Sequence, residues 1–284
     1  MENITTILKK NPLPFPTSRP HCSVIEGGKP VNACPECGEA LDAVYMNNPV
    51  YLASVGKEPH WTDLPCRKCE EMRAAAEREE RLLELRLKSC DLSRRFSEKT
   101  FEDFTFYGTV REKERQGVTL AAAREFADGF AGHKHAGTWM LFMGGVGTGK
   151  GHLCAGILNQ IIRNGYSGLF TKMPKLLREI KDTYSRYSET SQSEIINQTV
   201  RVDLLIVDEV GVQFGTETER MIIYEILDQR YEAMLPVILT TNCTELKALE
   251  NCLGERVIDR LYEGASKIIR FDWQSYRKHQ RNVR

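Results

Sequence analysis

The chain has 284 residues, of which 41% are hydrophobic, and its 39 basic and 39 acidic side chains give a formal net charge of zero. This composition supports a globular core with an appended module and excludes a globally basic nucleic-acid-binding protein, although a local basic groove is compatible with it. No segment approaches the roughly 18 apolar residues of a membrane span, and the amino-terminal residues lack an apolar signal-peptide segment. We therefore expect a cytoplasmic protein with no membrane partner, whose nine cysteines are thiols or metal ligands rather than disulfides.

The amino-terminal third divides into three segments by composition. Residues 1–30 are rich in proline and glycine, which predicts a disordered or extended segment. Residues 31–69 contain paired cysteines, and residues 70–100 contain many charged and helix-favouring residues, which predicts a helical linker between two domains. A solvated face is the simplest interpretation of the charges on that helix, and a partner-binding surface is the alternative.

Two C-x-x-C pairs, Cys34 with Cys37 and Cys66 with Cys69, predict a metal site in residues 31–69. Each pair can present two thiolates from a tight turn, and together they complete a tetrahedral Cys₄ zinc site. The segment between the pairs is longer than the usual spacing of about 15–20 residues, so we expect a small sheet or loop inside it. Structural zinc contributes on the order of 10 kcal/mol, enough to fold a module with little core of its own. A redox dithiol is the alternative.

From Phe101 onward, strand-like and helix-like segments alternate, which is typical of a parallel sheet with crossover helices. The sequence therefore predicts an α/β fold with a five-stranded parallel sheet. Strands are expected near residues 139–143, 167–172, 202–208, 236–241 and 267–271. The main predicted helices cover residues 149–163, 175–187, 217–234 and 254–263.

A glycine-rich loop between the first of these strands and its helix has the pattern of a phosphate-binding P-loop. Gly144, Gly149 and Lys150 match G-x-x-x-x-G-K-[S/T], whereas Gly151 stands where the pattern has a hydroxyl residue. Glycines permit positive φ angles, so backbone N–H groups can converge on phosphate oxygens at the helix N-terminus. Lys150 adds a cation for the β and γ phosphates. The predicted nucleotide-binding residues are Gly144, Gly145, Val146, Gly147, Thr148, Gly149, Lys150, Gly151 and His152.

Two further predicted strands end in polar side chains that can complete the site. Asp208 and Glu209 follow a buried-strand run, where Asp208 is expected to hold Mg²⁺ and Glu209 to orient the attacking water. Asn242 ends the next strand and can hydrogen-bond the γ-phosphate or the water. A turn or a cap of the following helix is the alternative for Asn242.

Arg256 and Arg260 lie four residues apart on one face of a predicted helix. Either can be a salt-bridged surface residue. Either can also be an arginine finger that reaches the ATP of a neighbouring subunit, a role worth roughly 10³–10⁵ in rate.

The ordered set of motifs resembles the DnaC helicase-loader group of AAA+ ATPases. The resemblance covers about residues 100–277. It implies an AAA+ P-loop NTPase domain at residues 101–277, followed by a basic tail at 278–284. Members of that group often lack the hydroxyl after the lysine, so Gly151 fits, and Arg260 becomes the first choice for the finger. The motifs are Gly-Thr-Gly-Lys-x-His-Leu at 147–153, Leu-Leu-Ile-Val-Asp-Glu-Val-Gly at 204–211, Leu-Gly-Glu-Arg-Val-Ile-Asp-Arg-Leu at 253–261 and Phe-Asp-Trp-Gln-Ser-Tyr-Arg at 271–277.

The resemblance also implies a function. A loader of this kind binds ATP and Mg²⁺, associates with itself through its ATPase domain, and delivers a DnaB-type hexameric helicase to single-stranded DNA during replication initiation. Nucleotide acts as an assembly and release switch, and we expect slow hydrolysis that an oligomer or DNA stimulates. Phage and prophage replication proteins and the loader DnaI likewise pair a zinc module with such an ATPase. The alternatives are an IstB-like transposition helper ATPase acting on duplex DNA and a non-catalytic zinc adaptor that binds nucleotide structurally.

Overall fold

The computed structural model describes residues 24–26, 29–31, 33–46, 52, 54, 56–57, 60–211, 216–263 and 266–283. The chain separates into two compact units, Met1–Arg81 and Leu82–Arg284. Most of the amino-terminal segment that is predicted to be disordered or extended, residues 1–23, lies outside the described residues.

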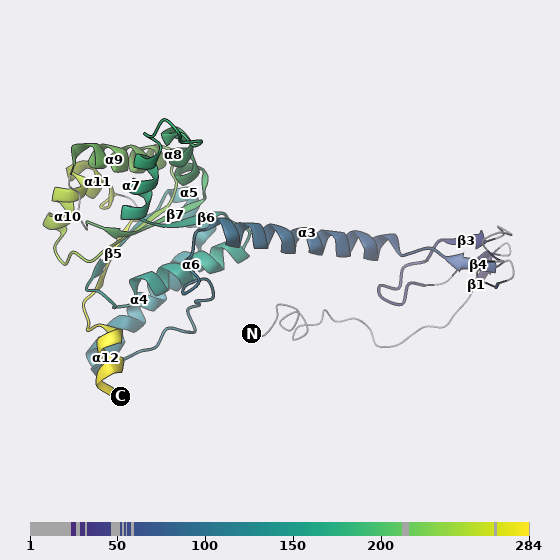
Figure 1. The fold of residues 1–284 in the computed structure, drawn as a ribbon. Coiled ribbons are helices and arrows are strands. Elements are labelled where there is room, and N and C mark those ends of the chain that lie inside the picture. Colours follow the sequence, from purple (N-terminus) through teal and green to yellow (C-terminus); the bar gives the residue numbers. More distant parts are fainter. Residues whose placement is uncertain are drawn as a thin grey trace. The chain divides into compact units, whose positions relative to one another are not determined.

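The first unit contains two small antiparallel sheets (Figure 1). Strand β1 (Val24–Glu26) pairs with β2 (Lys29–Val31), and β3 (Ala43–Met46) pairs with β4 (His60–Asp63). Because β3 and β4 lie between the two cysteine pairs in the sequence, the expected small sheet inside that segment is confirmed. Helix α3 (Arg67–Ser89) forms most of the helical linker predicted for residues 70–100. The prediction was wrong for residues 90–100, because the helix ends at Ser89 and Asp91 has a left-handed φ of +56°.

The second unit is built on a five-stranded parallel sheet with the strand order β6-β7-β8-β5-β9. All five predicted strands are confirmed, with shifts of one or two residues at their ends. They are β5 (Trp139–Gly144), β6 (Gly168–Lys172), β7 (Leu204–Val210), β8 (Val237–Thr241) and β9 (Lys267–Phe271). The predicted α/β fold class is therefore correct.

Helices cover both faces of this sheet, which explains the buried apolar runs Trp139–Met143 in β5 and Leu204–Val207 in β7 (Figure 1). Alternate residues of β5 point to opposite faces: Met140 and Phe142 belong to one buried cluster, and Leu141 and Met143 belong to the other. The first cluster includes residues of α4 (Val110–Asp128), α5 (Phe130–Ala136) and α6 (Lys150–Arg163). The second includes residues of α7 (Met173–Asp182), α8 (Gln192–Arg201), α9 (Glu217–Glu232), α10 (Leu246–Leu253) and α11 (Glu255–Arg260).

Two helix predictions require correction. The helix predicted for residues 175–187 ends as α7 at Asp182, because hydroxyl side chains beyond it bond to nearby backbone groups: Thr183 Oγ1 donates to Ile180 O, and Ser188 Oγ donates to Thr190 O. The helix predicted for residues 254–263 is shorter, as α11. No described helix is long and apolar enough to cross a membrane.

Candidate functional site

The P-loop leaves the carboxyl end of β5, which lies between β8 and β9, and runs into α6. Ligand sites of parallel sheets form at this edge, and the helix N-terminus favours anions. The loop borders a cavity of about 490 Å³. Four predicted site residues from three different elements line it together, namely Lys150, Asp208, Glu209 and Asn242. P-loop residues from Val146 to His152 line it as well.

Two glycines of the loop are required by positive φ angles and by close contacts, one with backbone and one with a side chain. Gly144 has φ of +150°, and a Cβ there would collide with the carbonyl oxygen of Phe271. Gly149 has φ of +105°, and a Cβ there would lie 2.8 Å from the ring of Phe104. The ring of Phe104 also packs edge-on against His152. Phe104 therefore belongs to the wall of this cavity.

The ammonium group of Lys150 is held by two carbonyl oxygens of the loop and by Asn242. Its Nζ donates to the carbonyl oxygens of Gly144 (2.6 Å) and Gly145 (2.8 Å) and to Asn242 Oδ1 (3.0 Å). Burial lowers the pKa of Lys150 to about 8, although the negative charge of Asp208 opposes this shift. Since charged phosphate oxygens bind an ammonium group more strongly than neutral carbonyls do, the same Nζ can exchange these partners for a nucleotide phosphate.

The two carboxylates at the end of β7 have different environments. Thr240 Oγ1 donates to Asp208 Oδ1. Glu209 forms an ion pair with Lys172, with 2.8 Å between Nζ and Oε1. The pairing register of β7 and β8 shifts between Val207 and Val210, and Glu209 has a left-handed φ of +61°. Asp208 and Glu209 both line the cavity at this bulge, and bulges and left-handed non-glycine residues are common beside functional sites.

The segment after β9 supports the P-loop, a contact that sequence reasoning missed. The indole Nε1 of Trp273 donates to Thr148 O (3.0 Å), and the backbone N–H of Tyr276 donates to Gly147 O (2.9 Å). Tyr276 begins α12 (Tyr276–Val283), from which Arg277 also lines the cavity. The Phe-Asp-Trp-Gln-Ser-Tyr-Arg motif at 271–277 was the available signal, but it gave no spatial role.

The two candidate finger arginines are absent from the described residues that line this cavity. Arg256 is exposed, and its Nη1 lies 3.4 Å from Tyr224 OH. Arg260 pairs with Asp228 and stacks on Tyr231, with its guanidinium carbon 4.1 Å from the ring centroid. The side chain of Arg260 is only 14% exposed.

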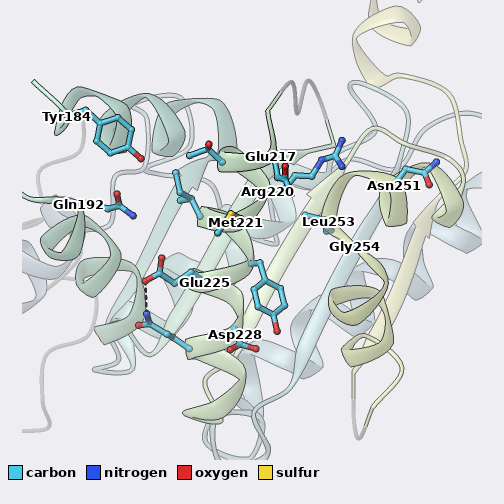
Figure 2. Close-up of a pocket in the computed structure, with 14 residues that line it drawn as sticks. Tyr184, Gln192, Glu217, Arg220, Met221, Glu225, Asp228, Asn251, Leu253 and Gly254 are labelled. Atoms are coloured by element: carbon cyan, nitrogen blue, oxygen red, sulfur yellow. Dashed lines mark hydrogen bonds between the residues drawn. The ribbon is translucent and has the colours of Figure 1, made fainter.

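A larger groove of about 1100 Å³ runs along α9, and Tyr224 and Asp228 are among its lining residues. Figure 2 shows Glu217, Arg220, Met221 and Glu225 along the same helix. The groove therefore adjoins the partners of both candidate finger arginines.

The four cysteines of the first unit converge as predicted. Their sulfur atoms all lie within 4.8 Å of one another, with 3.7 Å between Cys34 and Cys69 and 3.5 Å between Cys37 and Cys66. A tetrahedral zinc ion with bonds of about 2.3 Å holds its sulfur ligands ~3.8 Å apart, so the cluster fits zinc. Backbone hydrogen bonds from Cys37 and Glu36 lower the pKa of the Cys34 thiol to about 7. Burial raises the pKa of the Cys69 thiol instead, so metal binding has to displace its proton.

Comparison with known proteins identifies a family model and a curated relative that this chain matches. The family model described as "IstB-like ATP binding protein" matches residues 70–283. The replicative helicase loader DnaC of Escherichia coli strain K12 is 37% identical over 166 residues, which make up 58% of this chain and 66% of that protein. The chain thus spans slightly less than two thirds of the length of this curated relative.

Two solved structures resemble the fold. The crystal structure of the DnaC helicase loader matches with a TM-score of 0.54 and 22% identity, over 63% of this chain and 99% of that chain. The crystal structure of DnaI matches with a TM-score of 0.50 and 20% identity, over 66% of this chain and 95% of that one. At these identities the likeness concerns the fold, and the predicted AAA+ architecture is confirmed.

Proposed function

The chain belongs to the family of IstB-like ATP binding proteins, and on this basis we propose that it is an ATPase that loads a DnaB-type hexameric helicase onto single-stranded DNA during replication initiation. The observation that carries the proposal is the convergence of Lys150, Asp208, Glu209 and Asn242 on one cavity. The sequence similarity to a replicative helicase loader supports helicase loading as the process that this ATP hydrolysis serves.

In this proposal each residue of the cavity has a distinct task. The loop amides and Lys150 bind the β and γ phosphates, and Asn242, which accepts a hydrogen bond from Lys150, senses the phosphate end. Asp208 offers a carboxylate to Mg²⁺, which neutralises phosphate charge when bound. Gly151 contributes no hydroxyl ligand, so we expect weak metal retention and slow turnover.

The ion pair between Glu209 and Lys172 supports a slow basal rate. Glu209 has to turn from Lys172 before it can orient a water molecule. Both side chains are partly exposed, and such pairs contribute about 0–1 kcal/mol, so the pair retards hydrolysis without preventing it. A bound partner that draws Lys172 away would raise the rate.

Self-association is proposed to use the face that carries the two candidate arginines and the α9 groove. Arg260 was preferred from the sequence, but its ion pair with Asp228 and its stacking on Tyr231 have to break before it reaches another copy. Arg256 is exposed, and its hydrogen bond to Tyr224 is long at 3.4 Å. Arg256 is therefore the first arginine to test as the finger.

We assign the cysteine cluster to structural zinc and propose that the first unit, with α3, docks on the helicase. A four-thiolate site leaves no open coordination position, which is typical of structural rather than catalytic zinc.

The test is capture of a purified DnaB-type hexamer by the full-length chain with and without ATP, combined with ATP turnover on single-stranded and duplex DNA. We expect nucleotide-dependent capture and stimulation by single strands, both lost in Lys150→Ala. Lys247→Ala is the matched control, because Lys247 is exposed and pairs only with the nearby Glu250.

Two outcomes would overturn the proposal. Stimulation by duplex DNA alone, without capture of the hexamer, would favour the alternative of an IstB-like transposition helper ATPase. Capture that is unchanged in Lys150→Ala would refute the nucleotide switch.

A further inference from the structure

The segment of residues 91–100, called the connector here, joins α3 to the rest of the second unit and forms one wall of the nucleotide cavity. Arg95, Phe96 and Lys99 from the connector line the cavity together with the P-loop. Two of these three side chains are cationic, which suits a polyanionic ligand. The sequence motifs of the nucleotide site contain none of them.

Helix α6 holds the connector in place through two side chains. The buried Asn159 donates from Nδ2 to the carbonyl oxygens of Lys99 (2.8 Å) and Phe96 (3.3 Å). His152 donates from Nε2 to Thr100 O (2.8 Å). Because α6 begins at Lys150, the connector is bonded to the same helix that ends the P-loop.

Phe96 occupies the space into which a side chain at position 151 would project. A Cβ on Gly151 would lie 3.3 Å from Phe96 Cζ, and the hydroxyl or methyl group of serine or threonine would extend further. Gly151 is helical and is not among the positive-φ glycines, so its backbone would accept another residue. A side chain at position 151 therefore requires the Phe96 ring to shift by a few tenths of an ångström, whereas the backbone of the loop would accept it.

We propose that Phe96 is a pocket-forming residue that takes the place of the missing hydroxyl side chain and couples the position of the connector to nucleotide binding. This inference rests on the proposed nucleotide site but does not depend on the identity of the helicase. A ligand that orders the start of α6 presses against Phe96, and movement of Phe96 strains the hydrogen bonds of Asn159 and His152 to the connector.

A double-mutant cycle tests the steric part of the proposal. Affinity for a fluorescent ATP analogue is measured with and without Mg²⁺ for wild type, Gly151→Thr, Phe96→Ala and the double variant. We expect Mg²⁺ to tighten binding by at least about threefold more in the double variant than the product of the single effects, because only there can the hydroxyl reach the metal. Independent, multiplicative effects would overturn the proposal.

Two controls keep this cycle interpretable. Gly117→Thr places threonine in α4 where a Cβ meets no atom within 4 Å, and Phe106→Ala removes an exposed phenylalanine outside the cavity lining. Gly151→Ser replaces Gly151→Thr if the latter variant does not fold. If Lys150→Ala left nucleotide affinity unchanged, the nucleotide site would fail, which is a separate result from a cycle without coupling.

Limited trypsin digestion tests the coupling part. The connector offers Arg94, Arg95 and Lys99 as cleavage sites. We expect nucleotide to slow cleavage there at least about threefold in wild type, and Gly151→Thr to accelerate it without nucleotide by displacing Phe96. Cleavage rates that neither nucleotide nor Gly151→Thr changes would refute the coupling.

Discussion

The two units of this chain are stabilised by different physics. Among the described side chains of the first unit, Cys34, Leu52 and Cys69 are the buried apolar ones, and two of these belong to the cysteine cluster. The second unit buries apolar residues on both faces of its sheet. If the cysteine cluster binds zinc as we propose, the metal takes the place of a core in the first unit, whereas burial of apolar surface stabilises the second.

Removal of zinc is the most direct test of this difference between the two units. Chelation, or Cys37→Ser, should unfold the first unit by removing on the order of 10 kcal/mol of binding energy, while the second unit keeps its melting temperature. Zinc content and calorimetry of the full chain measure both effects. Cys252→Ser is the matched control, since Cys252 lies outside the cluster. Loss of both transitions on chelation would contradict the separation.

The reciprocal experiment removes apolar volume from the second unit. Leu141 is fully buried in β5, between β8 and β9, so Leu141→Ala should destabilise that unit by about 2–5 kcal/mol and leave the zinc affinity unchanged. Chemical denaturation of wild type and variant, followed by a separate probe in each unit, measures the change in the free energy of unfolding of each unit. A parallel loss of zinc would show that the two units unfold together.

Titration of Lys150 gives a smaller, pH-dependent effect. Its pKa of about 8 lies below the ordinary value of 10.5, so raising the pH above 8 neutralises the amine in the folded protein first. Nucleotide affinity should then fall, approaching a limit of about tenfold per pH unit. The free energy of unfolding changes in the opposite direction. Between pH 8 and 10.5 the contribution of Lys150 to it increases with pH, because the unfolded chain holds more protons than the folded chain.

Affinity measured from pH 7 to 9.5 checks this prediction. Lys150→Arg should bind nucleotide without that pH dependence, since a guanidinium keeps its charge. An equal pH dependence in Lys150→Arg would assign the titration to another group.

The smallest expected effect is on hydrolysis. Lys172→Ala frees Glu209 from its ion pair and should raise basal turnover by no more than about fivefold, corresponding to the 0–1 kcal/mol of an exposed pair. Steady-state turnover measures this rate, with Lys247→Ala as the control. A large decrease would instead indicate that Lys172 contacts the substrate.

The sequence predicted the features that are local along the chain. Strands β5, β7 and β8 each begin with an apolar run, and Lys150, Asp208 and Asn242 come after these runs, so topology alone gathers them at one edge. Helix α8 was not predicted, although the capping box of Ser191 and Glu194 was a usable signal.

The missed features are contacts between residues distant in sequence. Phe96 against Gly151 and Asp228 with Arg260 have no periodicity or spacing that marks them. The partner of a charge or the neighbour of a glycine depends on how elements pack, which a single sequence does not encode locally.

The contact between Gly144 and Phe271 has a practical consequence for anyone handling this protein. Strand β9 pairs with β5 next to the start of the P-loop and leads into Trp273 and Tyr276. Both of these residues donate hydrogen bonds to carbonyl oxygens of the loop. A purification tag or fluorescent fusion joined close behind α12 would therefore be anchored to the rear wall of the nucleotide site. Attachment chemistry at that end should be treated as a perturbation of ligand affinity, and untagged protein should serve as the reference.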